Sequence, residues 1–179
     1  GTELVYIYTF IRPLDNNNIK DAVVNWILHD DSSYGNISTW DVKNVTNMNS
    51  LFYRETSFNE DINNWNVENV RTMEYMFNGA TTFNQPLNSW NVENVSSMRF
   101  MFSNASSFNQ PLNSWDVSGV YYMTNMFEEA TSFNQDISNW NVENVRSMYA
   151  MFKDATSFNQ PLNSWTVDNV TTMNKMFNG

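Results

Sequence analysis

A tryptophan returns every 25 residues over most of this chain, and that period constrains the fold more than any other feature. The repeated tryptophans are Trp40, Trp65, Trp90, Trp115, Trp140 and Trp165. A valine follows two and five positions after each tryptophan, and a methionine follows eight positions after it. A fixed period of about 20 to 50 residues is typical of stacked repeats, in which each unit buries its apolar side against its neighbours. We therefore predict that the six indoles form a structural core, each packed on its copy in the adjacent coil.

Each repeat predicts a short strand followed by a short helix. In the third repeat, the alternation of Trp90 and Val92 is typical of a strand whose polar residues point the other way. The next apolar residues, from Val95 to Phe108, lie three or four positions apart, which is a helical spacing. The sequence thus predicts an α/β fold: a right-handed solenoid with one short parallel strand and one short helix in every 25-residue coil.

The first 36 residues do not fit the repeat and predict an N-terminal cap. The segment Glu3–Phe10 is rich in aromatic and β-branched residues, which favours a strand. The segment Asn17–His29 has apolar residues at helical spacing, and an asparagine at position 16, 17 or 18 is suited to cap that helix. We divide the chain into a strand-plus-helix cap, residues 1–36, and a solenoid of about six repeats, residues 37–179. The last repeat is incomplete, so we expect that the natural protein continues or that this end is covered.

The repeat resembles that of a known family. The phrase Leu-x-x-Trp-x-Val-x-x-Val is a variant of the leucine-rich-repeat phrase, and the unit at residues 140–160 is similar to the repeat of the BspA-like leucine-rich-repeat surface proteins. The segments 21–26 and 34–40 look like the entry segment of algal and protist members. The resemblance covers nearly all of the chain and implies a leucine-rich-repeat-like solenoid. It also implies an extracellular or cell-surface protein used for adhesion or protein binding.

Composition argues against several classes of function. The formal charge is −10, from 19 acidic and 9 basic residues, and such a surface repels nucleic acid and anionic lipid. No apolar run approaches the roughly 20 residues that span a bilayer, so we expect no membrane insertion by this segment. The chain has no cysteine and a single histidine, His29, and no nucleophile–base motif. We predict a non-enzymatic protein without catalytic residues, metal or cofactor.

Aromatic residues at positions that vary among the repeats are candidate contacts for a partner. They are Tyr75, Phe100, Tyr121, Tyr122 and Tyr149. The core columns do not require aromatic residues there, and partly exposed aromatic side chains are typical of protein interfaces. The alternative is that these rings add packing between adjacent helices.

The outward positions of the predicted strands form a polar sheet face. Its central members are Asn66, Asn91, Asp116 and Asn141. Such a face is either a solvated surface or a regular hydrogen-bonding surface for a polysaccharide or a repetitive protein. A mostly acidic column lies two positions further along, where a weakly held divalent cation is an alternative, although no calcium-loop pattern occurs.

Two functions follow as expectations. The first is a non-enzymatic scaffold, secreted or at the surface, that binds a protein or a glycan ligand. The alternative is a structural subunit of a filament, a cell-surface layer or a virion. Such a subunit would associate end to end through its open C-terminal coil, because an open edge templates further stacking.

Overall fold

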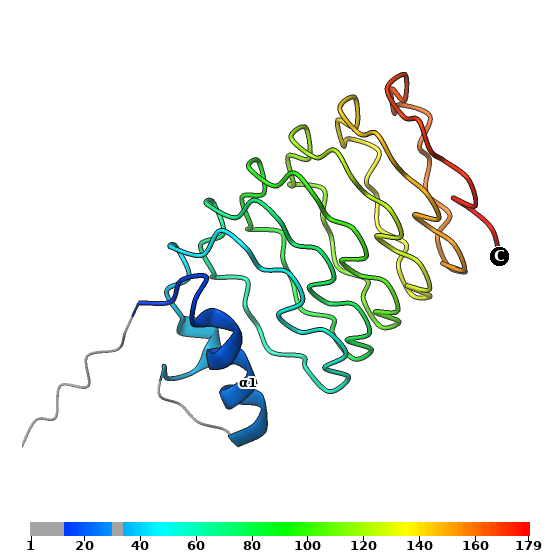
Figure 1. Cartoon of the computed structure of the whole chain (residues 1–179). Helices are drawn as coiled ribbons and strands as arrows, with labels where there is room; N and C mark the ends of the chain where they lie inside the picture. The colour runs from blue at the N-terminus through cyan, green and yellow to red at the C-terminus, as the bar shows by residue number, and fades with distance from the viewer. Residues whose placement is uncertain (1–12, 30–33) are drawn as a thin grey trace, which may run out of the picture.

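The computed structural model describes residues 13–29 and 34–179, and most of them form a stack of similar coils. One α-helix, α1, spans Ile19–His29, and a 3-10 helix, η1, spans Ile37–Thr39. From there the chain winds through successive coils that lie side by side, from α1 at one end to Gly179 at the other (Figure 1). The strand predicted over Glu3–Phe10 lies outside the described residues.

The predicted α/β solenoid, with a strand and a helix in every coil, is wrong. Within residues 13–29 and 34–179, α1 and η1 are the only helices, and β-pairing is limited to isolated parallel bridges. The helices of the described residues make up 8% of the chain and their bridge residues 5%, which is too little for a helix and a strand in every coil.

Tight turns occupy the segment in which a strand was predicted. In the third coil, the Trp90 N–H donates to the Leu87 carbonyl at 3.1 Å, and the Val95 N–H donates to the Val92 carbonyl at 2.9 Å. Each bond joins an N–H to the carbonyl three positions earlier and so closes a four-residue turn. Trp90 and Val92 are both buried, so their alternation reflects two turns that direct both side chains inward.

The segment in which a helix was predicted is bonded to the next coil. In the third coil, every second N–H donates to a carbonyl 24 positions further along the chain, over 2.7–3.0 Å. These donors are Met98, Phe100, Phe102 and Asn104. Three N–H groups that alternate with them donate to the carbonyl three positions back, and these donors are Met101, Ser103 and Ala105. We call residues 46–54 and their copies every 25 residues the ladder.

Residues with positive φ explain why the ladder is not helical. Phe100 has a φ of 56° and Asn104 a φ of 58°, both in the left-handed region. Two positions of every coil repeat this conformation. The first set is Ser50, Tyr75, Phe100, Asn125, Ala150 and Lys175, and the second is Arg54, Gly79, Asn104, Glu129, Asp154 and Gly179. Two left-handed residues four positions apart in each coil interrupt a right-handed helix, whereas they suit a series of turns. Helices and series of short turns share the spacing of three and four, so that spacing alone did not distinguish them.

The repeated aromatic residues form the core. The tryptophans from Trp40 to Trp140 are only 2–5% exposed, and the rings of Trp115 and Trp140 stack with centroids 6.4 Å apart and planes 3° apart. The Trp115 Nε1–H donates to the Leu87 carbonyl of the preceding coil at 2.9 Å, and the repeated indoles from Trp65 onward make the equivalent bond. Two columns of stacked phenylalanines run beside them, and within one coil Phe127 and Phe133 lie 4.0 Å apart. The 25-residue period of the sequence therefore corresponds to side chains that stack on the equivalent side chains of the adjacent coils.

Helix α1 covers the first coil. Its N-terminus is closed by a reciprocal pair of bonds: the Asp15 Oδ1 accepts from the Asn17 N–H, and the Asn18 Oδ1 accepts from the Asp15 N–H, both at 2.8 Å. Asn18, one of the three predicted capping residues, thus takes part together with Asp15. Ile19 and Val23 are fully buried, and Trp26 packs edge-on against Phe58 of the first coil.

Candidate binding face

The positions whose residue type changes most from coil to coil lie on the outer side of the ladder. In the first coil they are Thr46, Asn47, Asn49, Ser50, Tyr53 and Arg54. We call these positions and their copies every 25 residues the variable face. The inward positions of the same segment, Met48, Leu51 and Phe52, are buried and have nearly identical copies in every coil. The fold therefore fixes the inner side of the ladder and leaves the outer side free to differ.

Cross-coil hydrogen bonds hold the backbone of the variable face in register. The Arg71 N–H donates to the Thr46 carbonyl at 2.8 Å, and the Ser96 N–H donates to the Arg71 carbonyl at 2.9 Å. Equivalent bonds continue to the last coil. Because these bonds involve main-chain atoms, the side chain at each outer position can change without loss of the ladder.

Three aromatic rings form a continuous cluster over the first three coils. The rings of Tyr75 and Phe100 occupy the same position in adjacent coils and stack with centroids 4.6 Å apart. Tyr53 lies edge-on to Tyr75 at 6.4 Å and is 40% exposed. Tyr75 and Phe100 were predicted from the sequence as contacts, and Tyr53 was not, although its position varies among the repeats in the same way.

The other predicted aromatic contacts lie further along the variable face. Tyr121 and Tyr122 are 42% and 37% exposed, and the guanidinium of Arg99 lies 3.9 Å from the Tyr122 ring centroid, a cation–π geometry. Tyr149, in the next coil, is partly buried. All five predicted aromatic residues thus lie on one face. The coils contain no helices, but the stacking of Tyr75 on Phe100 means that these two rings also add packing between adjacent coils.

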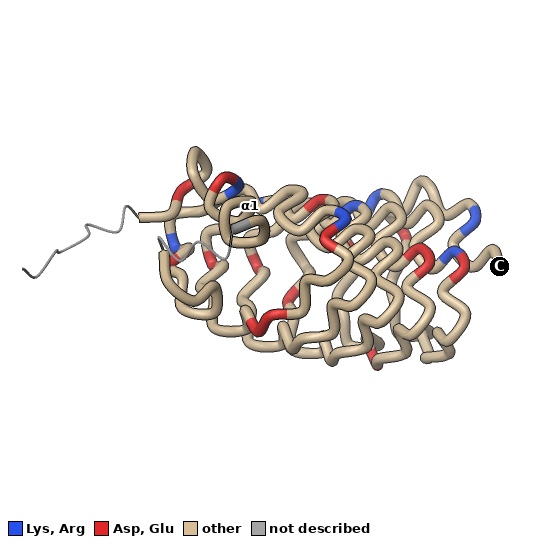
Figure 2. Tube along the Cα trace, turned by 90° about the horizontal axis from the view of Figure 1, so that it is seen from below, with Lys and Arg blue, Asp and Glu red and all other residues tan. Residues whose placement is uncertain are grey.

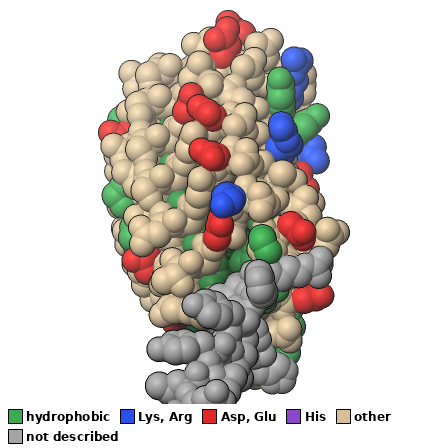
Figure 3. All heavy atoms as spheres, turned by 90° about the vertical axis from the view of Figure 1, so that its left-hand side faces the viewer, with side chains coloured by type: hydrophobic (Ala, Val, Ile, Leu, Met, Phe, Trp, Pro, Cys, Tyr) green, Lys and Arg blue, Asp and Glu red, His purple; other side chains and the backbone are tan. Residues whose placement is uncertain are grey.

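Basic residues collect on the same face. Its six basic residues are Arg54, Arg71, Arg99, Arg146, Lys153 and Lys175, and its four acidic residues are Glu74, Glu128, Glu129 and Asp154. Figure 2 shows most of the basic residues of the coils along one side of the stack, with acidic residues among them. Figure 3 shows basic and hydrophobic side chains next to each other along one edge of the molecule. The variable face therefore combines aromatic rings with positive charge.

Several acidic residues of the face are paired with its basic residues. Arg99 lies 3.7 Å from Glu74, and the Lys153 Nζ lies 2.8 Å from Glu128 and 3.2 Å from Asp154. The carboxylates of Glu128 and Asp154 raise the pKa of the Lys153 ammonium, first through the hydrogen bond to Glu128. These pairs neutralise most of the negative charge of the face.

The predicted polar sheet face is corrected by the structure, because its residues lie on tight turns. Their side-chain Oδ1 atoms accept the N–H two positions further on, at 3.0–3.1 Å. These residues are Asn66, Asn91, Asp116 and Asn141. Such bonds stabilise the local turn. At Asp116, hydrogen bonds from the Ser118 side chain and backbone hold the pKa of the carboxyl below its usual value. The four side chains are exposed, but no sheet orients them.

The recurring asparagines of the loops bond the adjacent coil. The Asn109 Oδ1 accepts from the Asn134 N–H at 3.0 Å and from the Gln135 Nε2 at 2.9 Å. On the tight turns that carry Asn66 and its copies, which we call the turn side, the Asn94 Nδ2 donates to the Glu68 carbonyl at 2.8 Å. These amides act as links between coils, which accounts for their repetition without a ligand.

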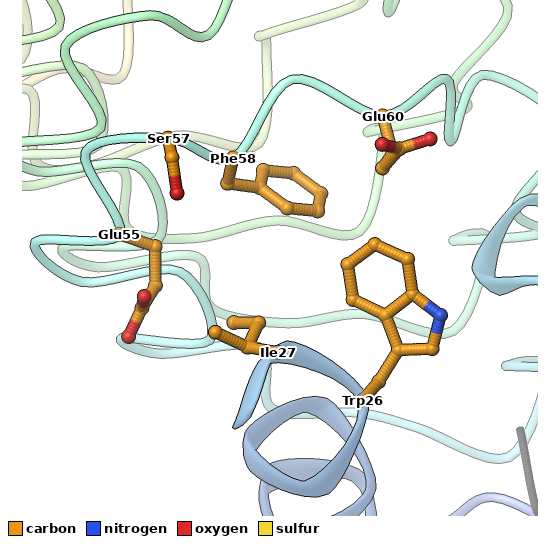
Figure 4. Close-up of a pocket in the computed structure, with 6 residues that line it drawn as sticks. All are labelled: Trp26, Ile27, Glu55, Ser57, Phe58 and Glu60. Carbon is orange, nitrogen blue, oxygen red and sulfur yellow. The ribbon is translucent and has the colours of Figure 1, made fainter. Parts of the chain in front are cut away.

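A shallow hollow of about 170 Å³ lies where α1 meets the first coil (Figure 4). Trp26 and Phe58, which pack edge-on, line it, and Glu55 and Glu60 lie at its edge. Both glutamates stand where the other coils carry alanine and glutamine, and both positions of this coil adjoin α1. Across the described part of the chain, no three His, Cys, Asp or Glu residues lie close enough to hold a metal ion.

Comparison with known proteins gives one match. A family model described as "Mycoplasma protein of unknown function, DUF285" matches residues 22–131 and 112–179. No curated protein and no solved structure matches the chain. In the described residues, no helix combines the length and the apolar character that crossing a bilayer requires.

Proposed function

The chain belongs to the DUF285 family, described as Mycoplasma proteins of unknown function, and from the geometry of its coils we propose that it is a non-enzymatic scaffold that binds a protein partner through the variable face. One observation carries the proposal: side-chain variation among the coils is concentrated on one face. Packing requires the repeated core residues but places no such requirement on the outer positions. Stacked repeats commonly use one extended face for binding, and differing outer residues give that face its specific contacts.

The composition of the variable face supports a protein partner. Tyrosine and arginine are enriched in the central contacts of protein interfaces. The face carries every tyrosine from position 46 onward and four of the chain's five arginines. A flat polar surface for a repetitive glycan lacks such distinct contacts.

We also propose a location at the cell surface or outside the cell, with a role in adhesion. This part of the proposal depends on the similarity of the repeat to BspA-like surface proteins. The family match itself shows only the DUF285 family. Immunofluorescence on intact, unpermeabilised cells tests it: labelling supports exposure of the protein, and labelling only after permeabilisation contradicts it.

The double substitution Tyr75→Asn and Phe100→Asn is expected to weaken partner binding by more than about tenfold, because aromatic contacts dominate most interfaces. Asparagine suits these left-handed positions and occurs there naturally at Asn125. Random-peptide display on the immobilised chain would provide binding peptides, and isothermal calorimetry would then give their affinities for each variant.

The matched control is Asn66→Thr with Asn91→Thr on the turn side, where threonine occurs naturally at Thr166. The control should leave affinity unchanged and change the melting temperature little, because a threonine hydroxyl can accept the same turn N–H, although more weakly. If the turn-side pair abolishes binding and the aromatic pair does not, the variable face is not the binding surface.

A second candidate function is assembly by end-to-end stacking. No described residue covers the outer side of the last coil, where Val167, Met173 and Phe177 are 37%, 40% and 62% exposed. These residues also line a hollow of about 170 Å³. Light scattering over a concentration series distinguishes the two functions. Assembly predicts a mass that rises with concentration and falls back in a Phe177→Asn variant, whereas a monomeric scaffold keeps a constant mass.

A further inference from the structure

Charge is divided unevenly between the variable face and the rest of the molecule. With six basic and four acidic residues, the face has a formal charge of +2, so the remainder of a chain of total charge −10 carries −12. Six of the nine basic residues of the chain are thus concentrated on one side of an acidic protein. Such a distribution attracts a negatively charged partner to this side and repels it elsewhere.

Most charged side chains of the variable face that take part in no ion pair are basic. Glu74, Glu128 and Asp154 are each within 4.0 Å of a basic residue of the same face. Among the described residues, four basic side chains of the face take part in no ion pair: Arg54, Arg71, Arg146 and Lys175. Glu129 is the one acidic side chain of the face without such a pair in the described part of the chain.

From these observations we propose that the variable face binds an acidic segment of a protein partner, extended along the stack. This inference rests on the proposed function and adds the chemistry of the partner. The free arginines supply guanidinium groups whose planar N–H donors match carboxylates in pairs. The aromatic cluster next to them supplies apolar contact for the remainder of the segment.

The spacing of the arginines sets the spacing of the carboxylates. Arg71 and Arg146 occupy the same position in coils that are three steps apart. At about 4.8 Å per step, their Cα atoms are separated by roughly 14 Å. An extended peptide rises about 3.3 Å per residue, so two acidic residues about four positions apart reach both arginines.

The aromatic rings favour a polypeptide over an anionic glycan. Tyr75 and Phe100 stack on each other with planes 7° apart, and Arg99 lies over the ring of Tyr122. Sugars stack on the free faces of aromatic rings, and here Tyr75, Phe100 and Tyr122 each have one face covered by a neighbouring side chain. These partly exposed rings suit the side chains of a peptide, since edge-on contacts are favourable for aromatic rings.

The test uses a fluorescein-labelled oligo-glutamate peptide as the probe, with a Gly-Ser peptide and heparin as comparison probes. Fluorescence anisotropy at low salt should show binding of oligo-glutamate to this acidic protein and none of the neutral peptide. The double variant Arg71→Gln with Arg146→Gln should weaken binding by more than about tenfold, and added salt should weaken binding to the wild type. The backbone bonds of these two residues do not involve their side chains, so the variant should melt as the wild type does.

The matched control is Lys20→Gln with Lys43→Gln, which changes the net charge equally but lies off the variable face. It should alter binding by less than about twofold. Equal losses in the two double variants, or binding of heparin without binding of oligo-glutamate, would overturn the proposal. Neutral display-selected peptides that depend on Tyr75 and Phe100 but not on the arginines would overturn it too, while leaving the proposed function intact.

Discussion

Replacement of Trp115 by alanine is expected to lower the free energy of unfolding by about 3–5 kcal/mol, because it opens a large cavity in the middle of the stack. The indole is 3% exposed and stacks on Trp90 at 6.5 Å and on Trp140 at 6.4 Å. The substitution also removes the donor to the Leu87 carbonyl. Each coil contacts only its neighbours, so we expect the two halves of the stack to unfold separately, giving a broader transition.

Thermal and urea unfolding followed by tryptophan fluorescence and circular dichroism measure this effect. Trp165→Ala is the control, because Trp165 is only partly buried in the last coil and has no described coil beyond it. Its loss should be clearly smaller. Equal effects of the two substitutions would contradict a core built from stacked indoles.

Replacement of Phe127 by alanine is expected to cost a similar amount, about 3–5 kcal/mol, since this ring joins the aromatic columns. It is fully buried, stacks on Phe102 and Phe152 at 5.6 Å, and lies 4.0 Å from Phe133 in its own coil. Removing it takes one aromatic contact from each of four neighbouring rings, including Trp140 at 6.4 Å. Urea unfolding at constant temperature gives the free-energy change directly.

Two further variants test whether the loss of stability at Phe127 comes from lost packing in the middle of the stack. Phe127→Leu keeps most of the buried volume and should recover more than half of the loss. Phe177→Ala changes the same position in the last coil, where the ring is 62% exposed, and should cost less than about 1 kcal/mol. A large effect at Phe177 and a small one at Phe127 would refute this packing.

The sequence was sufficient to predict the core. A 25-residue period in Trp, Met and Phe means that each side chain meets its own copy, and the stacking of Trp115 on Trp140 follows from that period. The helix of the cap was also predictable, because residues 17–29 combine helical spacing with a polar start.

The local conformation of the coils was not predicted, although a signal existed. Apolar spacing of three and four led to a helix, and the alternation of Trp90 with Val92 led to a strand. The position occupied by Arg54 in the first coil is Gly79, Asn104, Asp154 and Gly179 in other coils. Glycine and asparagine at a fixed position indicate a left-handed residue, which excludes a regular helix. This signal is weaker than the periodicity because Arg54 and Glu129 occupy the same position.

The candidate site was partly predictable. Alignment of the repeats singles out the variable positions, and five aromatic residues were selected in this way. The outer positions are spaced i, i+1, i+3, i+4, i+7 and i+8, so the predicted helix would also have placed them on one side of each coil. What the sequence did not reveal is how equivalent positions meet in adjacent coils: the stacking of Tyr75 on Phe100 depends on the ladder.

The geometry of the ladder therefore underlies both the fold and the proposed binding face, and Glu129 offers the most direct test of it. Its φ of 56° is unfavourable for any side chain with a Cβ, and no salt bridge involves it in the described part of the chain. The measurement compares the melting temperatures of Glu129→Gly and Glu129→Ala, which remove the same carboxylate. The ladder predicts that the glycine variant is the more stable, by about 0.5–1 kcal/mol or roughly 2 °C. A helix at this position would reverse the order, because alanine is favoured over glycine by about 1 kcal/mol in a helix interior. A more stable alanine variant would contradict the account.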